Sequence, residues 1–427
     1  MAAICKRNLA VHGAPPVRRK AWPSWPISTP ETEQEVLGVL RSGRWTISGP
    51  AVPAPLRERE FARRFAAYNG VRFCVPTANG SSALIIALEA LDIGPGDEVI
   101  VPVLTWVATA SSVLRVNATP VLVDIDADTL CLSVNAARAA VTERTRAILA
   151  VHLHHSMADI DALLQLSRET GIPLIEDAAQ AHGALWRGQR AGTFGRLGAF
   201  SFQQSKVLTG GEGGAVITND EHTYERLQEL RADSRRWVDQ PRDLDGMQLV
   251  ASGQIMGANY CLSELHAAIL LGQLPQLEEQ LERRAANAEY LDRVLKAVGY
   301  VQPLRQPAGL QRRAVYEYVV RVDRTKFGDR PVERICKALA AELQLSFYPT
   351  DPPLHRSALY RPLSNRRFLF SPERAGQLDP GPLRFPVAEA AHANGVVCHH
   401  AAFLATQSDM DDIVAAFEKL SRYADEI

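Results

Sequence analysis

The sequence predicts an α/β protein in which a mostly parallel sheet lies between layers of helices. Between residues 71 and 177, short apolar runs alternate with longer amphipathic runs, which is the pattern of parallel strands joined by crossover helices. Several polar residues directly follow the apolar runs, at the edge of the sheet where such folds bind ligands. The chain of 427 residues is also too long for one small core and suits two domains.

The first 30 residues predict an extended arm rather than a packed element, because they contain five prolines. Such an arm lies on a partner subunit or forms a loose terminus. Thr29 and Pro30 then supply an N-cap and a first helical position, so we expect a helix that runs to about Arg41 and stops before Gly43. A second, amphipathic helix is predicted over residues 56–68.

The alternating region predicts strands and helices in turn. The strands are expected at 73–76, within 96–102, and at 119–124, 147–152 and 173–177. The helices are expected at 83–91, 107–115, 135–141 and 159–170. The polar residues near the carboxyl ends of these strands are Asn79, Gly80, Ser81, Thr105, Trp106, His152, Asp177 and Gln180. We expect them to lie at the ligand-binding edge of the sheet.

The remaining chain predicts the end of the large sheet and a second, smaller domain. Strands are expected at 199–202 and 215–218, and helices at 221–232, 261–274 and 277–298. Residues 315–322 alternate and predict a strand of a new sheet, with helices at 331–343 and 410–423. Residues 348–386 are rich in Pro, Arg and Ser and predict a long surface loop. The expected domains are an arm at 1–30, a large domain that carries the site at 31–285, and a small C-terminal domain at 286–427.

Composition excludes several classes of function. The net charge is −1 and no block of Lys and Arg occurs, which disfavours nucleic acid as a partner. No apolar run has membrane-spanning length, and no apolar segment follows the basic residues of the N-terminus, so we expect neither a membrane span nor a secretory signal. The six cysteines form no CxxC pair, which argues against zinc or a disulfide framework and for a reducing cytoplasm.

Lys206 is unusually placed for a surface charge. It lies between two apolar strands and is followed by a cluster of glycines at 210, 211, 213 and 214. Burial or a cationic neighbour lowers the pKa of a lysine amine, which then acts as a nucleophile and forms a Schiff base with an aldehyde cofactor. The ordinary alternative is an exposed loop lysine.

The residues upstream of Lys206 match the needs of pyridoxal 5'-phosphate. Its phosphate requires a helix N-terminus with glycine and hydroxyl groups, and residues 78–82, ANGSS, supply these. Its ring nitrogen requires a carboxylate, for which Asp177 ends an apolar strand. Its ring face requires an aromatic such as Trp106. Each signal is weak alone, because a strand-terminal Asp also caps helices and a lone Trp is usually core.

Four motifs in order make the pattern specific. They are NGSSAL at 79–84, EDAAQAHG at 176–183, SFQQSK at 201–206 and GEGGAVI at 211–217. With these motifs the chain resembles the DegT/DnrJ/EryC1/StrS aminotransferases over essentially its whole length, including Asn259 and SELHAA at 263–268. The resemblance implies a fold type I pyridoxal-phosphate transferase, with a mostly parallel seven-stranded sheet in the large domain and a smaller C-terminal α+β domain.

The resemblance also implies roles for individual residues. Lys206 would form the internal aldimine and move the substrate proton, and Asp177 would pair with the pyridinium nitrogen. Trp106 would stack on the ring, and Gln180 would lie near its phenolic oxygen. The phosphate would be held by Gly80, Ser81, Ser201 and, from a second copy of the chain, Asn259. The implied assembly is therefore a homodimer with shared sites, while His182 receives no role beyond a structural one.

Within this family the chain resembles the L-glutamine:scyllo-inosose and L-glutamine:2-deoxy-scyllo-inosose aminotransferases of aminoglycoside antibiotic biosynthesis, at residues 9–18, 42–49 and 353–362. The resemblance implies ping-pong transfer of an amino group from glutamine to a keto-cyclitol. A polyhydroxylated ketone needs many hydrogen-bond partners, and the candidates to line its pocket are Trp45, Ser48, His154, His155, Arg235 and Tyr348. Ordinary loop positions are the alternative for each.

Two departures from the family pattern concern the substrate. Cys261 stands where the family commonly has an arginine, and His154-His155 stand where it commonly has Tyr-Gly. Two other enzyme functions therefore stay open: a nucleotide-sugar aminotransferase that uses glutamate, and an enzyme like 3-amino-5-hydroxybenzoate synthase. Sugar dehydrases of this group have histidine in place of the lysine, so Lys206 argues against that function.

Overall fold

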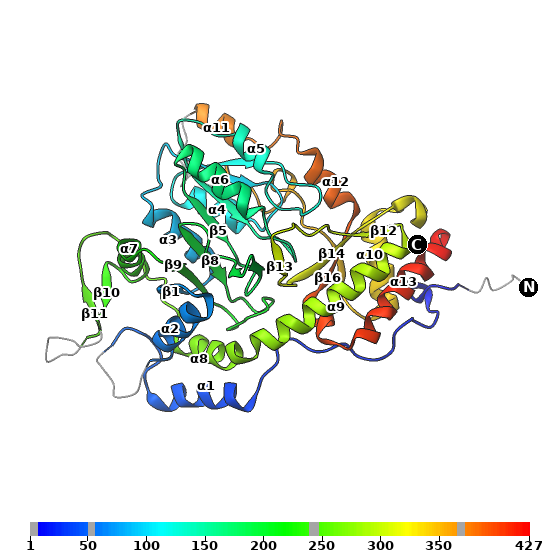
Figure 1. The fold of residues 1–427 in the computed structure, drawn as a ribbon, viewed down its shortest axis with the longest axis horizontal. Coiled ribbons are helices and arrows are strands. Elements are labelled where there is room, and N and C mark those ends of the chain that lie inside the picture. The colour runs from blue at the N-terminus through cyan, green and yellow to red at the C-terminus, as the bar shows by residue number, and fades with distance from the viewer. Residues whose placement is uncertain (1–6, 50–55, 239–246, 365–371) are drawn as a thin grey trace, which may run out of the picture.

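The computed structural model describes residues 7–49, 56–238, 247–364 and 372–427. A large sheet with helices on both sides occupies one part of the molecule, and a smaller sheet with its own helices occupies the other (Figure 1). No helix in the described ranges is long and apolar enough to span a membrane. This arrangement places the carboxyl ends of strands of the large sheet next to the smaller sheet, so residues from both sheets can lie close to one site.

The large sheet has seven strands in the order β1-β9-β8-β5-β4-β2-β3. β9 pairs antiparallel with both of its neighbours, and the other pairs are parallel. The predicted mostly parallel, seven-stranded sheet is thereby confirmed. Its strands are β1 (Phe73–Thr77), β2 (Glu98–Pro102), β3 (Thr119–Val123), β4 (Thr145–Val151), β5 (Leu174–Asp177), β8 (Leu197–Ser201) and β9 (Gly214–Thr218).

Alternate residues of β8 explain why helices cover both faces of the sheet. Ala199 packs into the core formed with α3 and α4, whereas Phe200 packs into the core formed with α2 and α8. Successive strand side chains point to opposite faces, so an apolar strand needs cover on both. The helices of this part are α1 (Pro30–Ser42), α2 (Arg57–Asn69), α3 (Gly80–Ala90), α4 (Ala108–Arg115), α5 (Val134–Ala139), α6 (Ile160–Thr170), α7 (Glu221–Arg231) and α8 (Glu264–Gln273).

Helix ends follow their capping residues. Thr29 caps α1 through the amide of Thr32, as predicted, and the helix ends before Gly43. α3 begins three residues earlier than predicted, because Asn79 forms a capping box with Ser82. Gly80 and Ser81 therefore belong to the first helical turn rather than to a preceding loop.

The smaller sheet is antiparallel, in the order β12-β14-β16-β15. Its strands are β12 (Val301–Pro303), β14 (Glu317–Val322), β15 (Phe347–Pro349) and β16 (Gly395–His399), and the helices around it are α9 (Leu277–Val298), α10 (Val332–Leu343), α12 (Pro386–Asn394) and α13 (Met410–Arg422). The predicted domain boundary at residue 285 falls inside α9, which continues unbroken from one part of the molecule to the other.

Several short helices and strands were not predicted from the sequence. Part of the predicted loop at 348–386 is regular, since it contains α11 (Pro372–Leu378) and the end of β15, whereas residues 365–371 lie outside the described ranges. The polar loop after α7 contains β10 (Arg235–Trp237), which pairs with β11 (Leu249–Ala251). β6 (Leu185–Trp186) and β7 (Gln189–Arg190) form a hairpin that β13 (Leu310–Arg312) extends.

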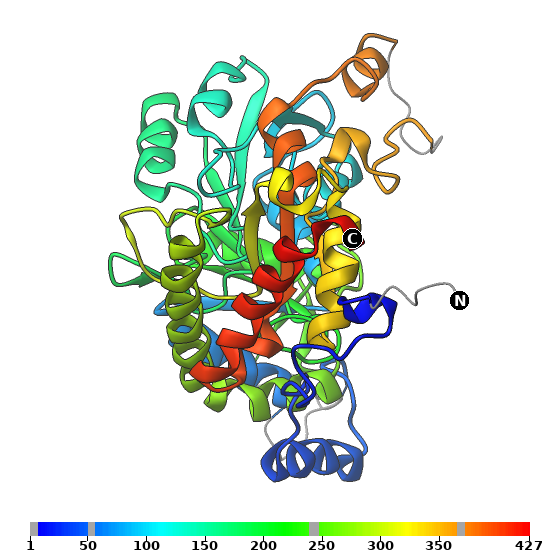
Figure 2. The ribbon, with the colours of Figure 1, turned by 90° about the vertical axis from the view of Figure 1, so that its right-hand side faces the viewer.

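The N-terminal segment packs on the small part of its own chain, which corrects the expectation of an unpacked arm (Figure 2). Leu9 is fully buried, and the amides of Ala10 and Val17 donate to the carboxylate of Glu342 in α10 at 2.8 and 3.0 Å. Arg18 is 2% exposed and pairs with Asp409 at 2.8 Å. Long-range polar contacts therefore order a segment whose composition indicated only an extended chain.

Candidate functional site

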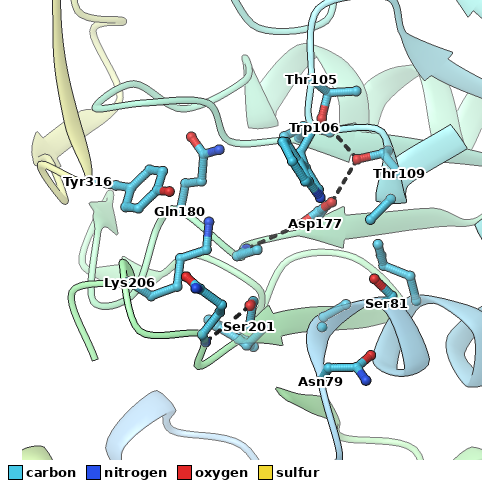
Figure 3. A pocket seen from close by; sticks show the side chains of 18 of the residues that line it. Asn79, Ser81, Thr105, Trp106, Thr109, Asp177, Gln180, Ser201, Lys206 and Tyr316 are labelled. Carbon is cyan, nitrogen blue, oxygen red and sulfur yellow. Dashed lines mark hydrogen bonds between the residues drawn. The ribbon is translucent and has the colours of Figure 1, made fainter. Parts of the chain in front are cut away.

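A cavity of about 410 Å³ opens at the carboxyl ends of β5 and β8, beside the N-terminus of α3 (Figure 3). All predicted cofactor residues but one lie in its wall. They are Gly80, Ser81, Trp106, Asp177, Gln180, Ser201 and Lys206. Asn259 is the exception. The cavity is where the topology of a parallel sheet places a ligand.

One end of the cavity suits an anion. The first amides of α3 lack acceptors within the helix and carry the positive end of its dipole. The hydroxyl groups of Ser81 and Ser201 line the same end. Gly80 allows the helix to approach β8 closely, because a Cβ at this position would lie 2.7 Å from Cβ of Ser201. These features match what a phosphate group requires.

Asp177 forms another wall of the cavity. Thr109 Oγ1 donates to its Oδ2 at 3.0 Å, the amide of Ala179 donates to its Oδ1 at 3.2 Å, and Thr105 and Thr109 are joined at 2.9 Å. Burial raises the pKa of Asp177, against the opposing effects of these hydrogen bonds and of the Lys206 charge. A buried carboxylate of this kind is stabilised by a cationic group in the cavity.

Lys206 lies at the wall nearest the small sheet. Its Nζ atom is 3.9 Å from the centroid of the Tyr316 ring, so the amine is not an exposed loop charge. Burial lowers its pKa, and the negative charges of Glu317, Asp177 and Asp351 act in the opposite direction. Trp106 is 53% exposed, and Figure 3 shows its ring next to Asp177. The cavity thus combines a perturbed amine, a buried carboxylate and an aromatic face.

His154 and Tyr348 meet at a carboxylate that the sequence analysis missed. His154 Nδ1 lies 2.7 Å from Glu317 Oε2, and the Tyr348 hydroxyl donates to Glu317 Oε1 at 2.8 Å. The His154 amide donates to Gln180 Oε1 at 2.6 Å, which ties this group to the cavity wall. His154 also adopts the left-handed backbone region, with φ of 59°, a conformation that is uncommon outside glycine and frequent at functional sites.

Four other predicted residues, Asn259, Arg235, Ser48 and Trp45, do not line this cavity. Asn259 Oδ1 accepts from the Cys261 amide at 3.2 Å, and Arg235 Nη1 donates to Ser48 Oγ at 3.3 Å. Trp45 is 53% exposed, and its carbonyl accepts from the amide of Glu264. These residues belong to neighbouring segments at the molecular surface, joined by the bridges Thr46↔Ser263 and Ala232↔Asn259. Within one chain the structure does not bring them to Lys206.

Three histidines near the motifs have structural surroundings. His155 is buried against β14, where its ring stacks on Tyr318 at 5.0 Å. His182 is buried beside Phe200 and Phe202, in agreement with the structural role expected for it from the sequence. His152 Nε2 lies 2.9 Å from Glu176 Oε2, and both side chains are fully buried. None of the three is among the residues that line the cavity.

Sequence reasoning also missed Thr109 and Tyr316. Thr109 lies in the first turn of α4, whereas Thr105 lies in the bend before that helix, so no helical spacing linked the two hydroxyls in the sequence. Tyr316 directly precedes β14 of the smaller sheet, and no local pattern links it to Lys206. Its hydroxyl lies 3.0 Å from that of Ser205, which fixes the loop that carries the lysine.

Comparisons with known proteins agree with these observations. The sequence pattern of the DegT/DnrJ/EryC1/StrS aminotransferase family matches residues 26–418. The chain is 48% identical to the L-glutamine:2-deoxy-scyllo-inosose aminotransferase of Streptomyces paromomycinus, over 98% of each chain. It is 45% identical to the L-glutamine:scyllo-inosose aminotransferase of Streptomyces griseus, over 97% of each. A solved structure of 3-amino-5-hydroxybenzoic acid synthase covers 95% of this chain and 99% of its own, with a TM-score of 0.78 and 30% identity.

Proposed function

Because the chain belongs to the DegT/DnrJ/EryC1/StrS aminotransferase family, we propose that it binds pyridoxal 5'-phosphate beside Lys206 and transfers an amino group from L-glutamine to a keto-cyclitol. The names of relatives at 45–48% identity over nearly the full chain support this donor and this class of acceptor. The observation that carries the proposal is the convergence of Lys206, Asp177 and the N-terminus of α3 on one cavity.

The residues present fit this cofactor at each of its chemical ends. Ser81, Ser201 and the first amides of α3 would hold the phosphate, and the absence of a side chain at Gly80 keeps that cradle open. Asp177 would hold the protonated ring nitrogen. When bound, pyridoxal phosphate supplies an aldehyde carbon and an electron-withdrawing ring.

The chain's own residues would perform the remaining tasks. The Lys206 amine would take the proton from the donor's α-carbon and later return one to the acceptor carbon. Its lowered pKa supports this role, because a larger fraction of the amine is neutral near pH 7 than in an exposed lysine. Trp106 would cover one face of the cavity and restrict the access of water. Thr109 and Ala179 would hold the Asp177 carboxylate in a fixed orientation.

The sharpest test follows the two half-reactions of the purified protein separately. With glutamine, glutamate or alanine as donor and no acceptor present, we expect glutamine to convert the absorbance of the bound cofactor most rapidly. Scyllo-inosose or 2-deoxy-scyllo-inosose should then restore it. Lys206→Ala is the control. It should lose the absorbance band of cofactor bonded to the lysine, and it should lose turnover. A preference for glutamate, together with tight binding of a nucleotide-diphosphate sugar, would instead favour the nucleotide-sugar aminotransferase.

Asn259, Trp45 and Arg235 lie outside the cavity of their own chain, and we propose that they serve the cavity of a second copy in a homodimer. Their exposed or half-buried positions at neighbouring surface segments support this arrangement. Asn259 would then reach the phosphate bound by the partner subunit.

A further inference from the structure

Glu317 is a carboxylate directly after Tyr316, a residue of the cavity wall, and the proposed function assigns it no role. It stands at the first position of β14, where the smaller sheet meets the wall formed by Lys206. The preceding residue, Tyr316, lines the cavity, and its ring lies beside the Lys206 amine at 3.9 Å. Figure 3 shows Tyr316 on one side of Lys206 and Asp177 on the other. Glu317 directly follows Tyr316 in the chain, and His154, which binds Glu317, is tied through its amide to Gln180 of the cavity wall.

Hydrogen bonds from two separate segments fix the Glu317 carboxylate. His154 binds one oxygen and Tyr348 donates to the other, and the Glu317 side chain is only 14% exposed. Burial acts to raise its pKa, but the hydrogen bonds from His154 and Tyr348 and the nearby Lys206 charge outweigh burial and hold the pKa below its usual value. Glu317 therefore carries a fixed negative charge at neutral pH.

The other titratable groups that face Lys206 do not replace this charge. Asp177 is engaged by Thr109 and Ala179 at the far wall. Burial, with the charge of Glu317 added, raises the pKa of Asp351. His182 and His400 are neutral near pH 7, because burial lowers the pKa of His182 to about 3 and that of His400 well below its usual value. Burial raises the pKa of Tyr316, so its phenol stays neutral as well.

We propose that Glu317 is a positioning residue for Lys206, whose fixed negative charge holds the ammonium form of the lysine at the small-sheet wall whenever its nitrogen is not bonded to the cofactor. The proposal rests on the proposed role of Lys206 as the reacting amine. An amine that must both take and return a proton needs an environment in which both protonation states are accessible. Burial alone favours the neutral amine, and a nearby carboxylate offsets that effect.

The test measures the proton affinity of Lys206 directly in the full-length protein freed of cofactor. A short pulse of acetic anhydride at a series of pH values, followed by peptide mass spectrometry, gives the midpoint at which Lys206 becomes reactive. Glu317→Gln keeps the size of the side chain and removes its charge, so the ammonium form loses stabilisation and the midpoint should fall by about one pH unit. At a fixed pH below the midpoint, acetylation of Lys206 should then be about tenfold faster.

Two further variants separate charge from structure. Tyr348→Phe removes one hydrogen bond to Glu317 but leaves its charge, so the wild-type midpoint should be kept. Glu317→Asp keeps the charge but shortens the side chain by one methylene, so a smaller shift of the Lys206 midpoint in the same direction is expected. If Glu317→Gln fails to fold, Glu317→Asp serves as the test variant in its place. Wild-type midpoints in both Glu317 variants would overturn the proposal, as would a shift in Tyr348→Phe equal to that of Glu317→Gln.

The same proteins loaded with pyridoxal phosphate provide an independent check. If glutamine fails to convert the wild-type cofactor absorbance, the donor assignment is rejected, whatever the midpoint of Lys206. If the wild type reacts with glutamine but Glu317→Gln keeps the wild-type midpoint, only the role of Glu317 is rejected. The two failures therefore give different results.

Discussion

Gly80→Ala is expected to weaken cofactor binding without unfolding the protein. The added Cβ would lie 2.7 Å from Cβ of Ser201 and 3.2 Å from its Cα, whereas non-bonded carbon atoms prefer about 3.5–4.0 Å. The N-terminus of α3 and the end of β8 must therefore separate by roughly 1 Å. Overpacking of this size typically costs about 1–3 kcal/mol.

The displaced groups are the ones assigned to the phosphate. The first amides of α3 move away from the Ser201 hydroxyl, so a ligand bound between them loses contact on one side. If the free energy of cofactor binding becomes less favourable by about 1.4–2.8 kcal/mol as a result, the dissociation constant of pyridoxal phosphate rises by about 10- to 100-fold. Backbone strain adds little, since Gly80 does not lie in the left-handed region.

The assay is titration of cofactor-free protein with pyridoxal phosphate, followed by absorbance, together with urea unfolding. Gly94→Ala is the matched control, because its Cβ would meet only the carbonyl oxygen of Val116 at an ordinary 3.7 Å. Both variants exchange glycine for alanine, so a general effect of the methyl group would appear in both. Wild-type affinity in Gly80→Ala would refute the assignment of the phosphate to the gap between α3 and β8.

Three other predictions follow from the contacts above. Asp177→Asn should fold and bind cofactor but slow the glutamine half-reaction by about 100-fold or more in stopped-flow absorbance, because the ring nitrogen loses its counter-charge; a rate within threefold of wild type would contradict this role. Arg18→Met should lower the free energy of unfolding by about 3 kcal/mol in urea at pH 7, since it leaves the Asp409 carboxylate without a buried partner. Hydrogen bonds from Thr406 and Arg18 lower the pKa of Asp409, so its stabilisation is present above the unfolded pKa and declines as the pH falls below about 4. The difference in the free energy of unfolding between wild type and Arg18→Met should therefore become smaller in acid. A difference that does not change with pH would exclude the ion pair as its source. Mixing Lys206→Ala with Asn259→Ala subunits should produce hybrid dimers with one intact site, and so recover about a quarter of wild-type turnover for random mixing of equal amounts; turnover no higher than the sum of the two variants would exclude shared sites.

The sequence motifs predicted most of the cavity because its residues follow strands of one parallel sheet. Asp177 ends β5, Ser201 ends β8, and the NGSS segment starts α3, so local patterns and their order were sufficient. The comparisons confirm the family that these motifs indicated. The roles of the individual residues toward the cofactor stay predictions until they are tested by substitution.

The residues that the sequence did not predict belong to the other sheet or to long-range contacts. Tyr316 lies beside Lys206, and Glu317 follows it, because β14 begins next to the cavity, and no local sequence pattern indicates this proximity. The start of α3 was misplaced because its capping box uses Ser82 at the position where Glu or Gln is the familiar signal. The N-terminal arm was misjudged because its partners Glu342 and Asp409 lie more than 300 residues further along the chain.

The packing of the arm affects how this protein should be trimmed for expression. The indole nitrogen of Trp25 donates to the carbonyl of Gln204 at 2.9 Å, two residues before Lys206, and the Trp25 ring covers the buried guanidinium of Arg284 at 4.9 Å. At the other end, Glu426 accepts from the amides of Asn8 and Leu9. A chain cut to the family match at 26–418 would lose all of these contacts. The segment that the family pattern matches is therefore narrower than the unit that folds and supports Lys206.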